Sequence, residues 1–433
     1  MHRMAARAPA VAPGGSAMTS ECYVYITLPG DTSPVTAGRF ELRKNRRGIA
    51  IGRFVYGRKY RERADALPLD PIELKLGDRV YETAALNGVF GAIRDAGPDH
   101  WGRRIIERHL GSANLGELDY LLHSPDDRAG ALGFGLNPVP PAPSRKFNRT
   151  LDLAQLQALA DAIIADEPLP EDEDGDQVAK LLELGTSMGG ARPKAVVEDD
   201  AGLWIAKFNR TDDKWNNARI EHAMLTLGRA CGLATAESRV IDIAGRDALL
   251  VKRFDREKTK RGYARARMVS GLTMLRADES PEGRDRWSYI LLVEELRRIS
   301  GEAKADAQEL FRRMTFNALI SNIDDHPRNH AAIAREREWR LSPAYDLTPS
   351  SPIAIEQRDL ALACGAKGRF ACRSNLLSES ARFLVPTAEA ETVIDDMAQR
   401  VAASWYEVAR ACGVTEQDCE RIGGAFVYPG FAP

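Results

Sequence analysis

The second half of the chain changes its hydrophobic pattern once, and this change limits the folds that it can adopt. Short apolar runs bounded by turn residues predict four strands, with one helix among them. Beyond Arg284 the apolar residues recur at helical spacing instead. We therefore expect an α+β fold with two lobes, the first rich in strands and the second all-helical. The predicted strands are Ala195–Glu198, Leu203–Phe208, Ala236–Ile243 and Ala248–Phe254, and the predicted helices are Ala218–Cys231, Trp287–Ile299, Asp306–Asn322 and Ala388–Cys412.

The first half of the chain predicts a separate subdomain in front of these two lobes. Runs of β-branched and aromatic residues predict an antiparallel sheet, and residues 100–123 change to helical spacing. Proline-rich residues 137–149 are typical of a linker, and a helix is expected from Leu153 to Ala165. The expected strands are Cys22–Leu28, Phe40–Arg43 and Ile49–Tyr56. The expected boundaries are 1–17 for a disordered leader, 18–140 for the N-terminal subdomain, 150–265 for the strand-rich lobe and 266–430 for the helical lobe.

Charge and cysteine content argue against several classes of protein. The 433 residues carry 60 basic and 62 acidic side chains, a net charge of −2, whereas general nucleic-acid binders usually have a basic excess. The six cysteines contain no CxxC pair, so neither a zinc site nor a secreted disulfide framework is indicated. No apolar stretch approaches the length of a membrane span, and prolines interrupt the one at the N-terminus. We expect a cytoplasmic protein that does not enter a membrane.

A polar loop directly after a predicted helix carries the residues with the clearest chemistry. The helix ends near Ile320, and the loop reads Asn322-Ile323-Asp324-Asp325-His326-Pro327-Arg328-Asn329. Asp324 and Asn329 are five positions apart, the spacing at which phosphoryl-transfer enzymes place a catalytic base and a metal-binding amide. A second carboxylate, Asp346, follows at the end of a short predicted strand. Because Mg²⁺ prefers hard oxygen ligands, we expect Asn329 and Asp346 to hold it while Asp324 orients the nucleophile.

The same loop admits other interpretations. Asp325 taken alone is typical of capping and turn chemistry. His326 and His330 are four positions apart, which on a helix would allow both to bind Zn²⁺ in a metal-dependent hydrolase. Pro327 lies between them and disfavours a continuous helix. The phosphoryl-transfer interpretation is therefore preferred.

A glycine-rich segment and a strand lysine accompany the loop. Residues 185–194 (Gly-Thr-Ser-Met-Gly-Gly-Ala-Arg-Pro-Lys) offer backbone N–H groups suited to phosphate, although the GK[ST] ending of a Walker A loop is absent. Lys207 interrupts an otherwise apolar predicted strand, and a buried ammonium there needs an anionic partner. ATP phosphates or the carboxylate of Glu221, on the following predicted helix, would serve. A later strand ends at residues 252–254, where the hinge of a two-lobed nucleotide kinase would lie, although Phe254 is equally compatible with an ordinary core position.

In combination these segments resemble the HipA-type kinases of bacterial toxin–antitoxin systems. The resemblance covers nearly all of the chain after the leader. The segments that carry it are Ser187–Lys194, Ile205–Phe208, Val251–Asp255, Asn322–Asn329 and Tyr345-Asp346, with Phe90–Ile93, Pro98–Arg103 and Asp127–Leu132 in the N-terminal part. It implies a two-lobed, protein-kinase-like fold with an added N-terminal subdomain and an all-helical C-terminal lobe.

The resemblance also implies a role for each site residue. Asp324 would be the catalytic base, and Lys207 would contact the ATP phosphates with Glu221 as its supporting ion-pair partner. Asn329 and Asp346 would bind Mg²⁺. Ser187 would be autophosphorylated, which silences the kinase. The ATP-binding set that it implies is Ser187, Met188, Gly189, Gly190, Ala191, Lys194, Lys207, Lys252, Arg253, Phe254, His326, Asn329 and Asp346.

The implied function is that of an ATP- and Mg²⁺-dependent serine/threonine protein kinase that acts as the toxin of a toxin–antitoxin module. Its partner would be a small helix-turn-helix antitoxin of the HipB type, and contact with DNA would be indirect, through that antitoxin. The substrate would be a protein, for example an aminoacyl-tRNA synthetase, whose modification slows growth and produces persistence. Two alternatives stay open: a non-catalytic pseudokinase that binds an antitoxin as a corepressor, and a kinase for a small molecule or a lipid.

Overall fold

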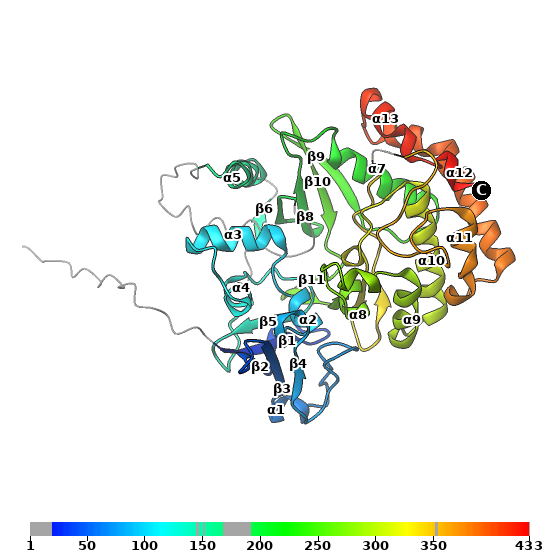
Figure 1. Cartoon of the computed structure of the whole chain (residues 1–433). Coiled ribbons are helices and arrows are strands. Elements are labelled where there is room, and N and C mark those ends of the chain that lie inside the picture. Colours follow the sequence, from blue (N-terminus) through cyan, green and yellow to red (C-terminus); the bar gives the residue numbers. More distant parts are fainter. Residues whose placement is uncertain (1–19, 144–146, 150–151, 168–191, 351–353, 433) are drawn as a thin grey trace, which may run out of the picture.

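A computed structural model describes residues 20–432, apart from 144–146, 150–151, 168–191 and 351–353. Its first sheet is antiparallel, with five strands in the order β4-β3-β2-β1-β5, and occupies one end of the molecule (Figure 1). Phe40 and Phe54 are paired across β2 and β3 and are fully buried, so the apolar positions of the strands face one core. The strands are β1 (Glu21–Thr27), β2 (Pro34–Lys44), β3 (Ala50–Tyr56), β4 (Tyr81–Thr83) and β5 (Leu132–Gly135).

Two helices take the place of the single helical stretch expected over residues 100–123. The first, α3 (His100–Leu110), begins at Asp99, whose carboxylate accepts from the N–H of Gly102 and caps the helix. It ends at Gly111, which has a φ of +62°, a left-handed conformation that favours glycine. The second is α4 (Glu117–His123). Two shorter helices, α1 (Arg58–Arg61) and α2 (Gly91–Asp95), precede them.

The second sheet has the strand order β6-β7-β8-β10-β9, with β6 parallel to β7 and the other pairs antiparallel. Alternate residues of β10 face opposite layers: Leu250 packs with α5, and Leu249 packs beside α7. Trp101 and Ile105 of α3 belong to the same apolar cluster as α5, so α3 contributes to the core of this lobe. The elements are β6 (Asn148–Arg149), α5 (Leu153–Ala165), β7 (Lys194–Asp199), β8 (Gly202–Phe208), α7 (Asn217–Ala230), β9 (Ser238–Ile243) and β10 (Arg246–Lys252), followed by the hairpin β11 (Arg256–Thr259) and β12 (Gly262–Arg265).

Helices dominate the C-terminal lobe, shown in yellow-green to red in Figure 1. The α+β, two-lobed fold is confirmed, but the expectation of an all-helical C-terminal lobe needs a correction, because an antiparallel sheet β13-β14-β15 lies within it. These strands have four residues at most, too few to show alternation in the sequence. The elements are β13 (Arg267–Ser270), α8 (Gly271–Leu275), α9 (Tyr289–Ile299), α10 (Ala303–Leu319), β14 (Ala331–Ala334), β15 (Arg340–Leu341), α11 (Arg373–Ser378), α12 (Thr387–Ala411) and α13 (Glu416–Ile422).

The long helices match the sequence closely. The bounds of α5 are those expected, and α7, α9, α10 and α12 begin and end within three residues of the predicted ones. Within the described ranges, no helix is both long enough and apolar enough to cross a membrane. Short 3-10 segments lie at η1 (Ala85–Gly88), η3 (Gly283–Arg286), η4 (Pro327–Asn329), η5 (Ser380–Phe383), η6 (Gly423–Ala425) and η7 (Pro429–Phe431).

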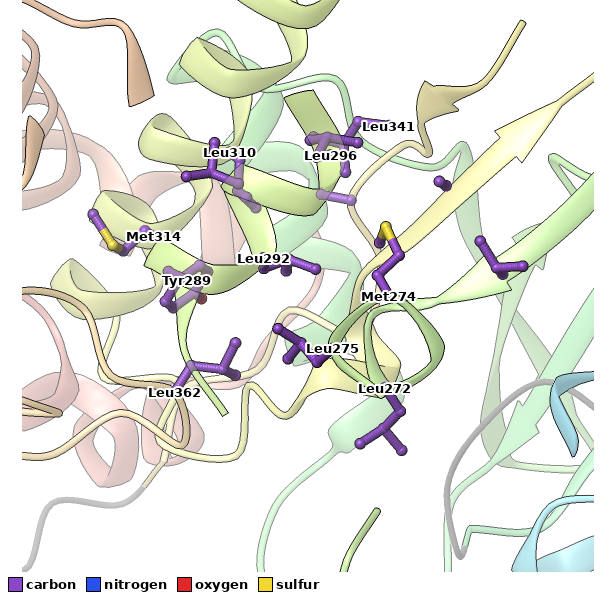
Figure 2. Packing of buried hydrophobic residues seen from close by; sticks show 14 of the residues in the cluster. Leu272, Met274, Leu275, Tyr289, Leu292, Leu296, Leu310, Met314, Leu341 and Leu362 are labelled. Carbon is purple, nitrogen blue, oxygen red and sulfur yellow. The ribbon is translucent and has the colours of Figure 1, made fainter. Parts of the chain in front are cut away.

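A buried apolar cluster supports the loop formed by residues 322–329. Figure 2 shows Leu275 of α8, Leu292 of α9 and Leu310 of α10 among its members, all of them buried. Burying each such side chain contributes about 1.5–3 kcal/mol. At the start of α8, Gly271 donates its N–H to the carbonyl of His330 at 2.7 Å, and a side chain there would collide with the backbone of Pro327. The core thus fixes the 322–329 loop through a close backbone contact.

Candidate active site

The predicted site residues that the structure describes, except Arg253, line one or both of two adjoining cavities. The larger has a volume of about 730 Å³ and is lined mainly by charged and polar side chains. The smaller has a mostly apolar wall formed by Ile205, Val251, Phe254, Met268 and Tyr345. The residues that line both cavities are Pro98, Asp99, Lys207, Arg328, Asn329 and Asp346. The smaller cavity is therefore an apolar recess that adjoins the larger, charged cavity.

Two lysines lie side by side in the larger cavity. Lys194 of β7 is directly opposite Lys207 of β8, and like charges at opposed strand positions are destabilising unless counter-charges are close. The Nζ of Lys194 lies 2.6 Å from Oδ2 of Asp99. The Nζ of Lys207 lies 2.7 Å from Oε1 of Glu221 and 2.7 Å from Oδ1 of Asp346. The two ammonium groups make this cavity suited to an anion with several charges.

The charge state of Lys207 follows from its two acidic partners. Burial alone would lower the pKa of Lys207, but Asp346 and Glu221 outweigh this effect and hold the pKa above its ordinary value. Burial alone would likewise raise the pKa of Asp346, but the Lys207 ammonium outweighs it and keeps that pKa below the ordinary value. Both groups are therefore charged at neutral pH.

The 322–329 loop brings three predicted residues to the larger cavity: Asp324, His326 and Asn329. The backbone N–H of His326 donates to the carbonyl of Asp324 at 2.7 Å, and Nδ2 of Asn329 donates to the same carbonyl at 3.4 Å. Partial burial, with a smaller contribution from Asp346, raises the pKa of the Asp324 carboxyl. The buried Nδ1 of His326 has no hydrogen-bond partner within the described part of the chain, as expected of a group that a bound ligand would satisfy.

Asp346 reaches the cavity through an unusual backbone conformation. Its φ of +60° lies in the left-handed region, which few residues other than glycine adopt and which Asp tolerates. Such conformations cluster at functional sites. The strand expected to end at Asp346 is β15, which instead ends at Leu341. The hydroxyl of Tyr345 donates to the carbonyl of Arg328 at 2.6 Å and fastens this segment to the 322–329 loop.

Asp325 lines neither cavity and instead anchors the loop to the buried core. Its Oδ2 accepts from the hydroxyl of Tyr289 and lies 2.9 Å from Nε2 of His330, and all three side chains are buried. The chain of hydrogen bonds continues from Asn317 to Tyr289 at 3.1 Å. His330 is thus held in this buried network while His326 lines the cavity. Among the described residues no group of three or more His, Cys, Asp or Glu side chains is arranged to hold a metal, which gives the zinc-hydrolase interpretation no support.

The buried network makes a prediction for stability. Asp325→Ala is expected to lower the free energy of unfolding by about 2–4 kcal/mol, because the Tyr289 hydroxyl and the His330 imidazole would each lose a buried partner. Urea denaturation monitored by circular dichroism would measure the change. Asp285→Ala, at an exposed position of η3, serves as the control and should change little. Equal effects of the two substitutions would contradict an anchoring role for Asp325.

Residues 252–254 are placed differently from one another. Lys252 and Phe254 line the smaller cavity, and the Lys252 ammonium lies 2.9 Å from Oε2 of Glu237. The Arg253 side chain points away from both cavities and pairs with Asp255. The structure does not bring Arg253 to the site, because successive side chains of an extended segment face opposite sides. The backbone N–H groups of Lys252 and Arg253, expected to serve as a hinge, already donate to carbonyls within the protein.

The glycine-rich segment is described only from Arg192 onward. Five predicted ATP-binding residues therefore lie outside the described residues: Ser187, Met188, Gly189, Gly190 and Ala191. Sequence reasoning missed Asp99, the partner of Lys194, which lies 95 positions earlier in the chain. Asp99 lies in the segment Pro98–Arg103, which carries part of the resemblance, but the role that its local sequence indicates is that of a helix N-cap. Sequence reasoning also missed the 2.8 Å ion pair between Arg328 and Glu279 at the larger cavity.

The family of this chain is shown by its match to a protein-family model. The model of the HipA-like C-terminal domain matches residues 186–405 of the 433, half of the chain. The chain belongs to the HipA-like family. The matched range contains Lys194, Lys207, the 322–329 loop and Asp346, which line the larger cavity or reach it.

Two curated relatives and one solved structure are also similar to this chain. "Putative kinase Y4dM" of Sinorhizobium fredii is 27% identical over 226 residues, which cover 45% of this HipA-like chain and 52% of the relative. A "Putative kinase" of Haemophilus influenzae is 26% identical over 186 residues, covering 39% and 54%. The chain thus spans about half the length of the curated relatives it matches. Among solved structures, the complex of the Shewanella oneidensis toxin–antitoxin proteins HipA and HipB with operator DNA contains a chain with a TM-score of 0.67 and 16% identity, covering 93% of this chain and 94% of that one, a likeness that establishes the fold.

Proposed function

We propose that this HipA-like protein is an ATP- and Mg²⁺-dependent serine/threonine protein kinase that acts as the toxin of a toxin–antitoxin module. The observation that carries the proposal is the convergence of Asp324 and Asn329 of one loop, Lys207 of β8 and Asp346 of a third segment on one charged cavity beside an apolar recess. The family match and the names of the curated relatives support it. The boundaries 18–140, 150–265 and 266–430 are retained as the proposed domains.

The nucleotide is proposed to lie across the two cavities. Adenine occupies the apolar recess, where the rings of Phe254 and Tyr345 lie 5.4 Å apart between centroids and provide aromatic surface. The triphosphate then lies in the larger cavity, toward the ammonium groups of Lys194 and Lys207. Glu221 keeps Lys207 in place through its two hydrogen bonds of 2.7 and 2.9 Å.

Asp346 and Asn329 are the proposed Mg²⁺ ligands. They present a carboxylate and an amide side chain to the same cavity, and Mg²⁺ usually takes one or two protein oxygens and completes its shell with phosphate and water. The unpartnered, buried Nδ1 of His326 supports a polar ligand in this place. When bound, Mg²⁺ would neutralise charge on the triphosphate.

Asp324 is the proposed general base. A serine or threonine hydroxyl of the substrate attacks the γ-phosphorus, so that a new O–P bond forms while the bond between that phosphorus and the β–γ bridging oxygen breaks. ADP leaves, and the hydroxyl proton passes to the Asp324 carboxylate. The raised pKa of Asp324 suits this role, because a carboxylate with a higher pKa accepts a proton more readily.

The partners and regulation are proposed from the family. A helix-turn-helix antitoxin of the HipB type would bind the chain, and the solved Shewanella complex of HipA and HipB with operator DNA supports this choice. DNA would then be contacted through the antitoxin, in the cytoplasm. The substrate would be a protein, with an aminoacyl-tRNA synthetase as one candidate. Autophosphorylation of Ser187 would add a charge of about −1.5 to −2 to the glycine-rich segment and so inactivate the kinase.

Incubation of the purified chain with γ-labelled ATP tests the proposal. Label is expected to pass to serine or threonine, with Ser187 identified by mass spectrometry, and chelation of Mg²⁺ should stop the transfer because the phosphate charge is then unneutralised. ATP binding without transfer to any acceptor would favour the pseudokinase corepressor. Label recovered only in small molecules or lipids would favour the other alternative.

A further inference from the structure

The ion pair between Lys194 and Asp99 joins two distant parts of the chain inside the larger cavity. The two side chains are 3% and 6% exposed, and Nζ and Oδ2 are 2.6 Å apart. Lys194 belongs to the residues matched by the family model, whereas Asp99 lies well before them. The acid that neutralises one of the two cavity lysines is thus supplied from outside the matched region.

Asp99 is fixed in place independently of the Lys194 ammonium group. Its other oxygen, Oδ1, accepts from the N–H of Gly102 at 2.8 Å and caps α3. The indole N–H of Trp101 donates to the carbonyl of Lys194 at 3.2 Å, and Arg104 donates to the carbonyl of Ile163 at 2.6 Å. With Trp101 also buried in the core of the strand-rich lobe, α3 cannot turn Asp99 away from the cavity.

The position of Asp99 has an electrostatic consequence for any phosphate ligand. Asp99 lines both cavities and places a fixed negative charge beside an ammonium that faces the space proposed for the triphosphate. Charges held within several ångströms inside a protein interact strongly compared with charges in water. A triphosphate that approaches Lys194 therefore meets both the attraction of the ammonium and the repulsion of Asp99.

We infer that Asp99 is a positioning residue that restrains Lys194 and lowers the affinity of the site for nucleotide phosphates, so that phosphate and Asp99 compete for one ammonium. This inference rests on the proposed function of the cavity as a nucleotide site. Because such coupling is reciprocal, bound triphosphate weakens the contact between Asp99 and Lys194. Nucleotide binding and the ion pair between Asp99 and Lys194 are then mutually antagonistic, so a residue of the N-terminal part of the chain influences the affinity of the site.

Nucleotide binding to Asp99→Asn tests the inference. Asparagine keeps the size of the side chain and its capping ability and removes only the charge. Isothermal titration of the full chain with adenosine, ADP and ATP is expected to give an ATP Kd lowered about tenfold, a smaller change for ADP and none for adenosine, as follows from a charge effect. Asp99→Ser, which also caps helices, should repeat the pattern if the first variant does not fold.

Asp161→Asn is the matched control. Asp161 lies on α5, outside both cavities, and forms an ion pair of 2.5 Å with Arg246, so the same chemical change should leave all three Kd values unaltered. Unchanged or weaker ATP binding by Asp99→Asn, with adenosine unaffected, would overturn the inference. Equal weakening of all three ligands would also overturn it, because it would mean that Asp99 only supports the fold. A wild-type chain that binds no nucleotide would instead overturn the proposed function, and the inference with it.

Discussion

Asp324→Asn is expected to reduce the rate constant of phosphoryl transfer by about 10²–10⁴-fold and to leave the affinity for ATP nearly unchanged. The amide has the size of the carboxylate but cannot accept the hydroxyl proton. The bonds that His326 and Asn329 make to this residue go to its main-chain carbonyl and do not depend on the side chain. Initial rates of label transfer at several ATP concentrations would separate the two effects.

The pH dependence of the wild-type rate provides a second measurement of the same role. A general base must be ionised, so the rate should fall as the pH falls through the pKa of Asp324. Since that pKa is raised, chiefly by burial, the fall should begin at a higher pH than for an ordinary aspartate. The residual rate of Asp324→Asn should lack this fall. Undiminished incorporation in the variant would refute the assignment of the base, whereas Asp285→Asn in η3 should behave as wild type.

The parts of this fold that sequence could predict are those governed by local pattern. The amphipathic periodicity of α9 and α12 reflects one apolar face for each helix, and a face of that kind is visible in a single segment. The apolar content of α10 made it equally visible, although every residue from Arg313 to Leu319 is buried. That Asp324 and Asn329 line one cavity could also be predicted from a local pattern, because one short loop carries both residues. The ion-pair candidate Glu221 could be named from Lys207 because it lies on the next helix along the chain.

The remaining features depend on contacts between distant segments. Asp99 reaches Lys194 across 95 positions, and although the segment Pro98–Arg103 carries part of the resemblance, its local sequence indicates a helix cap and no partner for Lys194. Asp325 resembles a turn residue in sequence, and its anchoring role depends on Tyr289 of α9 lying beneath the loop. The resemblance implies that Arg253 belongs to the nucleotide site, whereas its side chain faces the opposite side of the segment from Lys252 and Phe254.

Asp255→Ala is expected to lower the free energy of unfolding by about 3–5 kcal/mol, because it would leave buried charges without their partner. The Asp255 side chain is fully buried and accepts from Arg253 at 3.0 and 2.8 Å and from Arg256 at 2.7 Å. It also accepts from the N–H of Gly130 at 2.9 Å, so it joins the strand-rich lobe to the N-terminal part. Asp65→Ala, which breaks an exposed pair with Arg63, is the control and should change stability little.

The pH dependence of this loss identifies its cause. Burial alone would raise the pKa of Asp255, but Arg253 and Arg256 outweigh it and hold the pKa well below the ordinary value. A lowered pKa in the folded state contributes stability that is complete above the unfolded pKa, about 3.9, and that is lost as the pH falls further. The difference in unfolding free energy between wild type and Asp255→Ala should therefore be constant near neutral pH and shrink below about pH 4. A difference that stays constant down to pH 3 in urea denaturation would show that lost packing, rather than the buried ion pairs, accounts for the destabilisation.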